Sequence, residues 1–71
     1  MARMYQKGER RREDLLRATL RLIGARGADA VTHRAVAEEA GVPLSATTYY
    51  FASKEELLEQ SLLMALSLIH I

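Results

Sequence analysis

The tripeptide Gly41-Val42-Pro43 breaks a sequence that otherwise favours helix on both sides. Glycine readily adopts the positive φ that ends a helix, and a proline two residues later prevents the helix from continuing. Immediately before the break, Val36, Ala37 and Ala40 form an apolar face of small side chains. Small side chains let a following helix cross closely at a large angle, so the segment predicts a helix-turn-helix.

The rest of the chain carries helix signals and no alternating strand pattern. A first helix is predicted over 9–26, with Gly27 as its end, because apolar residues recur there at helical spacing. Thr32 is the predicted N-cap of a second helix, and a third covers 44–50. Ser53 and Glu56 predict a capping box at the start of a fourth helix, with the Glu56 carboxylate reaching back to Ser53. The sequence therefore predicts an all-α fold.

Several residues share the faces that we expect to be buried. Their apolar or small side chains follow one stripe on the first helix and one on the fourth. They are Leu15, Leu16, Thr19, Leu22 and Ile23 on the first helix, and Leu57, Leu58, Ser61, Leu62 and Ala65 on the fourth.

Three of the four aromatic residues are consecutive, at 49–51. At helical spacing Tyr49 shares an outer face with Ser45 and Thr48, whereas Phe51 lies on nearly the opposite face with Thr47. We therefore expect Phe51 to be buried, Tyr49 to be exposed and the intervening tyrosine to lie at the boundary.

The charge is divided unevenly along the chain. Residues 1–34 carry nine Lys/Arg against four Asp/Glu, whereas residues 35–71 carry one against five, for a net charge of +1. Such a division favours a basic end that faces a polyanion, although a solvated charged arm would look the same. The segment from Arg3 to Arg12 is a candidate basic arm that follows the DNA backbone or minor groove, or is disordered without DNA.

The residue inventory argues against catalysis. The chain has no cysteine, no Ser/His/Asp grouping and no glycine-rich phosphate loop, so no enzyme, cofactor or metal site is predicted. No secretory signal or membrane-spanning stretch is apparent, which favours the cytoplasm. The alternative to DNA binding is a small helical adaptor whose basic first helix binds an acidic protein or a membrane surface.

The stretch "LLRATLRLIGARGADAVTHRAVAEEAGVPLSATTYYFASKEELL" resembles the N-terminal DNA-binding domain of TetR-type transcriptional regulators. The resemblance covers roughly residues 10–62 and includes "VAEEAGV", the aromatic cluster and "SKEEL" in order. It implies a homeodomain-like three-helix domain with a helix-turn-helix, whose third helix enters the major groove, plus the start of a fourth helix. The chain departs from the family pattern at Pro43, Ala46, Thr47 and Thr48.

The resemblance and the chemistry of the side chains predict how DNA would be held. Thr32 and His33 stand where the family contacts the DNA backbone, although a histidine there is often a plain surface residue. Arg34 can bind phosphate or guanine. The other predicted contacts lie on or beside the third helix: Leu44 and Ala46 at thymine methyl groups, Ser45 and Thr48 at polar edges, and Tyr49, Tyr50 and Lys54 at phosphates.

The expected organisation is a basic arm at 1–9, the helix-turn-helix domain at 10–53, and the start of a connecting helix at 54–65. The tail "LSLIHI" at 66–71 is similar to the translation of a sequencing adapter, so we expect genuine sequence to stop near Ala65. The resemblance implies that a full-length parent is a ligand-responsive repressor: a homodimer on double-stranded DNA, with an inducer bound to a C-terminal domain. The 71-residue chain itself is expected to be a monomer.

Overall fold

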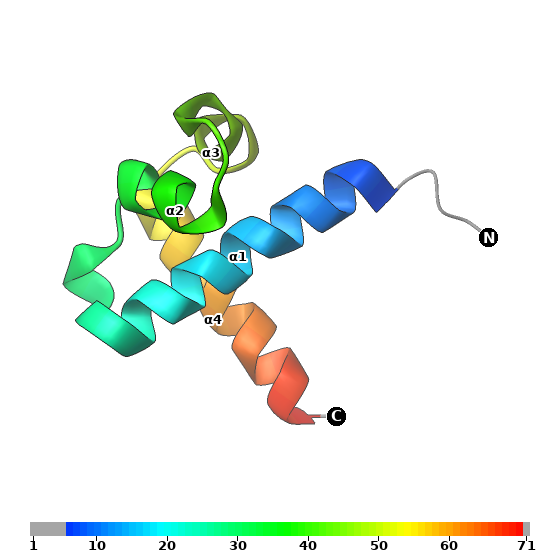
Figure 1. Ribbon diagram of the computed structural model, residues 1–71. Helices are drawn as coiled ribbons and strands as arrows, with labels where there is room; N and C mark the ends of the chain where they lie inside the picture. The colour runs from blue at the N-terminus through cyan, green and yellow to red at the C-terminus, as the bar shows by residue number, and fades with distance from the viewer. Residues whose placement is uncertain (1–5, 71) are drawn as a thin grey trace.

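The computed structural model describes residues 6–70, and the side chains of residues 10–67. The described residues form four α-helices joined by short turns, with no strand among them (Figure 1). These elements are α1 (Gln6–Arg26), the 3₁₀ turn η1 (Ala28–Ala30), α2 (His33–Ala40), α3 (Leu44–Tyr50) and α4 (Lys54–His70). The all-α prediction is confirmed.

Helix α1 is the long element on which the other helices pack. Both α2 and α4 contact it, and α2 in turn contacts α3 (Figure 1). Helix α1 begins at Gln6, so residues 6–9 of the segment predicted as an arm are helical, and Arg3 lies outside the described residues. Helix α1 ends at Arg26, and Gly27 follows with φ at 91°, which confirms the predicted helix end.

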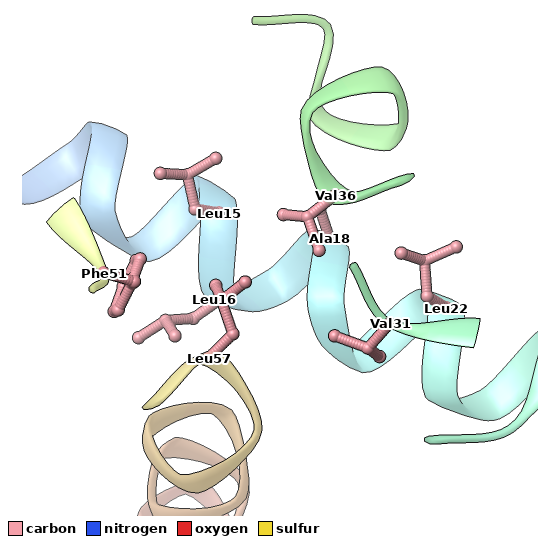
Figure 2. Close-up of a cluster of buried hydrophobic side chains, with 8 residues drawn as sticks. All are labelled: Leu15, Leu16, Ala18, Leu22, Val31, Val36, Phe51 and Leu57. Carbon is pink, nitrogen blue, oxygen red and sulfur yellow. The ribbon is translucent and has the colours of Figure 1, made fainter. Parts of the chain in front are cut away.

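One core lies between the helices (Figure 2). Helices α1, α2 and α4 contribute apolar side chains to it, and so do the residues that directly follow η1 and α3. Its fully buried members are Leu15, Leu16, Ala18, Leu22, Val31, Val36, Phe51 and Leu57. Four predicted stripe positions of α1 are buried, and Ile23 packs at the edge of the core. On α4 the prediction was wrong for Leu62, which is 51% exposed, because the buried face of α4 runs through Leu57, Ser61 and Met64 and Leu62 lies to one side of it.

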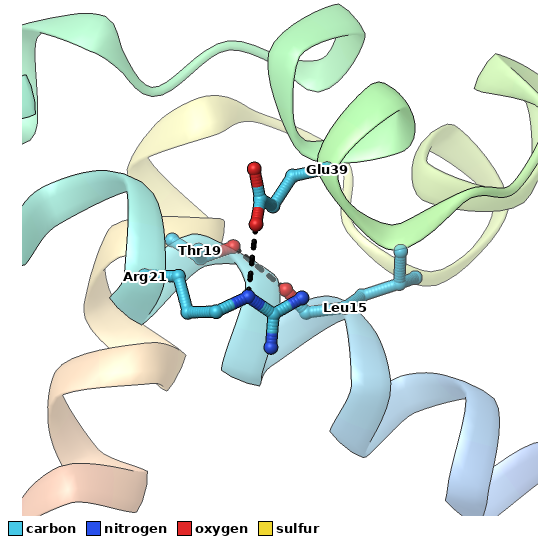
Figure 3. Close-up of polar contacts among 4 residues, drawn as sticks. All are labelled: Leu15, Thr19, Arg21 and Glu39. Atoms are coloured by element: carbon cyan, nitrogen blue, oxygen red, sulfur yellow. Dashed lines mark hydrogen bonds and ion pairs between the residues drawn. The ribbon is translucent and has the colours of Figure 1, made fainter. Parts of the chain in front are cut away.

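Three hydroxyl groups are buried within this small core, and each donates a hydrogen bond to a carbonyl of its own helix. Thr19 bonds the Leu15 carbonyl at 2.8 Å (Figure 3), and Ser61 bonds the Leu58 carbonyl at 3.0 Å. The third is Thr47, described below. Satisfying these donors locally keeps the cost of their burial low and lets helices approach closely.

Arg12 joins three parts of the fold although it lies in the segment predicted as an arm. Its guanidinium donates a hydrogen bond to the Gln60 side chain of α4 at 3.0 Å, and lies 5.5 Å from the centre of the Phe51 ring. A guanidinium over an aromatic face is attracted by the ring's negative face. Arg12 therefore packs among the folded helices, although it is also the last residue of the candidate basic arm from Arg3 to Arg12.

An ion pair joins the outer sides of α1 and α2 (Figure 3). The Nε atom of Arg21 lies 2.9 Å from a carboxylate oxygen of Glu39, and the two side chains are 56% and 37% exposed. Solvent screens a pair this exposed, so it contributes little to stability, at most about 1 kcal/mol.

Candidate nucleic-acid interface

The helix-turn-helix depends on a cap at each end of α2. At its start, the Thr32 hydroxyl accepts a hydrogen bond from the Ala35 backbone N–H at 3.0 Å, which confirms the predicted N-cap. At its end, Gly41 adopts the left-handed conformation with φ at 73°. The Gly41 N–H bonds the Glu38 carbonyl and the Val42 N–H bonds the Ala37 carbonyl, which together form a Schellman motif.

Helix α3 starts directly after this turn. Pro43 precedes it with φ at −67°, and its carbonyl accepts a hydrogen bond from the Ala46 N–H. The helix lasts only seven residues, and Phe51, with extended backbone, ends it. The turn thus projects α3 away from α1, as Figure 1 shows.

The two faces of α3 differ as the sequence predicted. Thr47 is fully buried and Phe51 is 1% exposed, whereas Tyr49 is 82% exposed. Tyr50 is half-buried, and its ring meets that of Tyr49 edge to face with centroids 5.0 Å apart. The outward face of α3 therefore consists of short side chains and one fully presented phenol.

The predicted contact residues on and around α3 are all at least partly accessible. Ser45 and Thr48 are exposed, Leu44 is 42% exposed, and Ala46 is half-buried. The Thr48 hydroxyl bonds the Ser45 carbonyl at 3.2 Å, which leaves its oxygen available as an acceptor. Ser45 and Thr48 share one helix face with Tyr49, and no acidic residue of that helix lies on it. Leu44 and Ala46 border this face on opposite sides.

Two exposed cations flank this face along the chain. Arg34 lies in the first turn of α2, and Lys54 is the first residue of α4. Between Ala40 and Lys54 the chain contains no Asp or Glu. An anion approaching the outward side of α3 therefore meets positive charge without a competing carboxylate from this segment.

The start of α4 is capped, although not quite as predicted. The Ser53 hydroxyl accepts from the Glu56 N–H at 3.1 Å, as in a capping box. The Glu56 carboxylate, however, accepts from the N–H of Ala52 at 2.9 Å, one residue before the predicted Ser53. The chain leaves α3 in an extended conformation at Phe51, which turns the Ala52 N–H toward the carboxylate.

His33 is not the plain surface residue that we considered from the sequence. Its ring is partly buried, with Nδ1 3.2 Å from the Thr47 hydroxyl oxygen. Its Nε2 atom is buried and has no hydrogen-bond partner among the described residues. In this conformation Nδ1 is engaged with Thr47 and Nε2 is shielded from solvent. Sequence patterns did not reveal the His33–Thr47 contact, because it joins residues fourteen positions apart.

This geometry agrees with a comparison to known protein families. Residues 15–60 match the sequence model for bacterial regulatory proteins of the tetR family. The chain belongs to the TetR family. The match covers the helix-turn-helix and its supporting helices, so this TetR-family domain is a DNA-binding domain of transcription regulation.

Two curated TetR-family relatives are similar over the same region. The chain is 42% identical over 50 residues to the HTH-type transcriptional regulator PksA of Bacillus subtilis (strain 168), covering 70% of this chain. It is 45% identical over 54 residues to the HTH-type transcriptional dual regulator CecR of Shigella flexneri, covering 76% of this chain. In both cases the chain spans 24% of the relative's length. No solved structure matches the chain significantly.

Among the helices over residues 6–70, none combines the length and the apolar character needed to cross a bilayer.

Proposed function

We propose that this TetR-family domain binds double-stranded DNA sequence-specifically by inserting the outward face of α3 into the major groove. One observation carries the proposal: that face is exposed, uncharged and rich in hydroxyl groups, and exposed cations flank it at Arg34 and Lys54. The major groove admits an α-helix and presents distinct donors, acceptors and thymine methyl groups. A face of this composition suits that surface.

The side chains at the start of α3 are the candidates for reading bases. Leu44 presents an apolar side chain suited to a thymine methyl, and Ala46 offers a smaller methyl group at the other border of the outward face. The hydroxyls of Ser45 and Thr48 can pair with either donor or acceptor edges, so they add affinity with little discrimination. Arg34 can bind phosphate or pair with guanine.

Other residues are suited to phosphates, which fix the position of the protein on the duplex. The Thr32 oxygen already accepts from Ala35, so its own O–H remains free to donate to a phosphate. Tyr49 presents its phenol to solvent, and Tyr50 braces that ring from a partly buried position. Lys54 adds a positive charge at the first turn of α4, where helix geometry also favours an anion.

The role of a complete regulator is part of the same proposal. A parent protein with a C-terminal domain would form a homodimer and hold two copies of α3 about 34 Å apart, on successive turns of a palindromic site. A small-molecule inducer bound to that C-terminal domain would alter this spacing and release the DNA. The parent would then act as a ligand-responsive repressor in the cytoplasm.

A salt titration tests the proposal. Fluorescence anisotropy of a labelled random duplex should give binding whose log K falls linearly with log[salt], with a slope near −0.9 per neutralised phosphate. Lys54→Ala should reduce the slope by about one unit. Arg26→Ala removes an exposed cation from the last turn of α1, outside the predicted contact residues, and should leave the slope unchanged.

Two results would contradict this proposal. One is an absence of DNA binding at low salt together with binding to anionic lipid vesicles, which the adaptor hypothesis predicts. The other is an equal loss of slope in the Lys54 and Arg26 variants, which would indicate diffuse binding by the whole basic surface.

A further inference from the structure

We propose that His33 is a positioning residue for α3, acting through a hydrogen bond from its Nδ1–H to the Thr47 hydroxyl, and not a DNA contact. The inference rests on the proposed function in so far as α3 is the DNA-reading helix. The position of His33 in the sequence suggested a contact with the DNA backbone. The proposal gives it a structural role instead, within the protein.

The hydrogen-bond geometry determines which ring nitrogen carries the proton. The Thr47 hydroxyl has a single hydrogen, and its shorter contact, at 2.8 Å, is to the Leu44 carbonyl, which can only accept. The hydroxyl oxygen must therefore accept in its 3.2 Å contact with His33 Nδ1, so Nδ1 is the donor. Neutral His33 is then the Nδ1–H tautomer, and the buried Nε2 atom is unprotonated.

The opposite tautomer is worse on two counts. It would place the Nδ1 lone pair against the Thr47 oxygen, unless the hydroxyl gave up its bond to Leu44. It would also leave an N–H at Nε2 buried without an acceptor among the described residues, and an unsatisfied buried donor is costly. The structure therefore favours one tautomer.

The contact matters because it involves the most buried side chain of α3. Thr47 is the only fully buried residue within this seven-residue helix. The Gly41–Pro43 turn holds one end of α3, and Phe51 anchors the other in the core. The His33–Thr47 bond supplies a directional contact at the middle of the helix. It resists rotation of α3 about its own axis, and such rotation would change which side chains face the groove.

The tautomer can be measured without DNA. Long-range ¹⁵N–¹H correlation spectra distinguish protonated from unprotonated ring nitrogens. His33→Gln identifies the signals. We expect His33 to be protonated at Nδ1 in the wild type, and to lose this preference in Thr47→Val but not in Thr47→Ser. An Nε2–H tautomer in the wild type would overturn the proposal.

A matched pair of substitutions tests the positioning role. His33→Asn keeps an amide N–H at about the reach of Nδ1, whereas His33→Gln moves it to about the reach of Nε2. Residual dipolar couplings of the α3 amides, measured without DNA, should match the wild type in His33→Asn and Thr47→Ser. They should differ in His33→Gln and Thr47→Val. Identical couplings in all four variants would refute a positioning role whether or not the domain binds DNA.

The same variants have distinct expected effects on DNA binding. His33→Gln and Thr47→Val should each weaken duplex binding by about fivefold to tenfold, the loss expected for one neutral hydrogen bond. The salt slope should stay at the wild-type value because no phosphate contact is removed, in contrast to Lys54→Ala. If His33→Gln retained affinity while His33→Asn lost it, the ring would contact DNA through Nε2. Failure of the wild type to bind any duplex would count against the proposed function, and the couplings would still decide the positioning role.

Discussion

Replacing Phe51 with alanine is expected to remove most of the stability of this domain. The ring is 1% exposed, and it is the largest of the fully buried side chains. Figure 2 shows it beside Leu16 of α1 and Leu57 of α4, where it closes one end of the core. Removal of a buried phenyl ring costs about 3–5 kcal/mol through lost transfer energy and the cavity that remains.

Two further energies determine how much of the domain's stability Phe51→Ala removes. The variant also loses the attraction between the ring and the Arg12 guanidinium, which is worth about 0.5–1 kcal/mol at a partly exposed site. The whole core of a domain this small supplies only about 3–5 kcal/mol of net stability. The combined loss is as large as that total, so Phe51→Ala should be largely unfolded in buffer.

Urea denaturation followed by far-UV circular dichroism provides the measurement. With a slope of about 1 kcal/mol per molar urea, the midpoint should fall by about 3 M or disappear. Tyr49→Ala is the matched control, because that ring is 82% exposed and two residues away, and its loss should change stability by less than about 0.5 kcal/mol. A Phe51→Ala protein with the wild-type midpoint would refute the buried placement of the ring.

Three other substitutions give smaller effects in the same urea assay. Thr32→Ala should cost about 1 kcal/mol because the N-cap of α2 is lost, and Thr32→Ser should restore it; equal stability of both would argue against the cap. Gly41→Ala should cost about 1–2 kcal/mol, since alanine is strained at φ near 73°, and a neutral result would place the turn in another conformation. Arg21→Ala should lower the free energy of unfolding by less than about 1 kcal/mol, and by still less in high salt, because its ion pair with Glu39 is exposed. A larger, salt-independent loss would contradict this weak contribution of the ion pair.

The sequence was sufficient to predict the helices because their ends carry strong local signals. Gly27 ends α1, Thr32 and Gly41 cap the two ends of α2, and Ser53 begins α4, each through interactions that span only a few residues. The inward Phe51 followed from helical spacing alone.

Features that depend on how the helices pack were predicted less well. Leu62 belongs to the predicted stripe, but which side of that stripe is covered depends on how α4 packs against α1, and the packed side runs through Leu57, Ser61 and Met64. Arg12 belongs to a run of arginines in the sequence, and only the approach of α4 and Phe51 gives it internal partners. The His33 contact likewise requires the fold, because Thr47 faces inward and meets α2 across the turn.

The central claim is that the outward face of α3 and its flanking residues contact DNA, and the most direct test is to map that contact on the ¹⁵N-labelled chain. A titration with a short duplex should shift the backbone amides of residues 43–54 and of Thr32 to Arg34 most strongly. Shifts should be small at the C-terminal end of α1 and along α4 beyond its first turns. Shifts concentrated instead on the exposed arginines of α1, with those of α3 unchanged, would contradict the account.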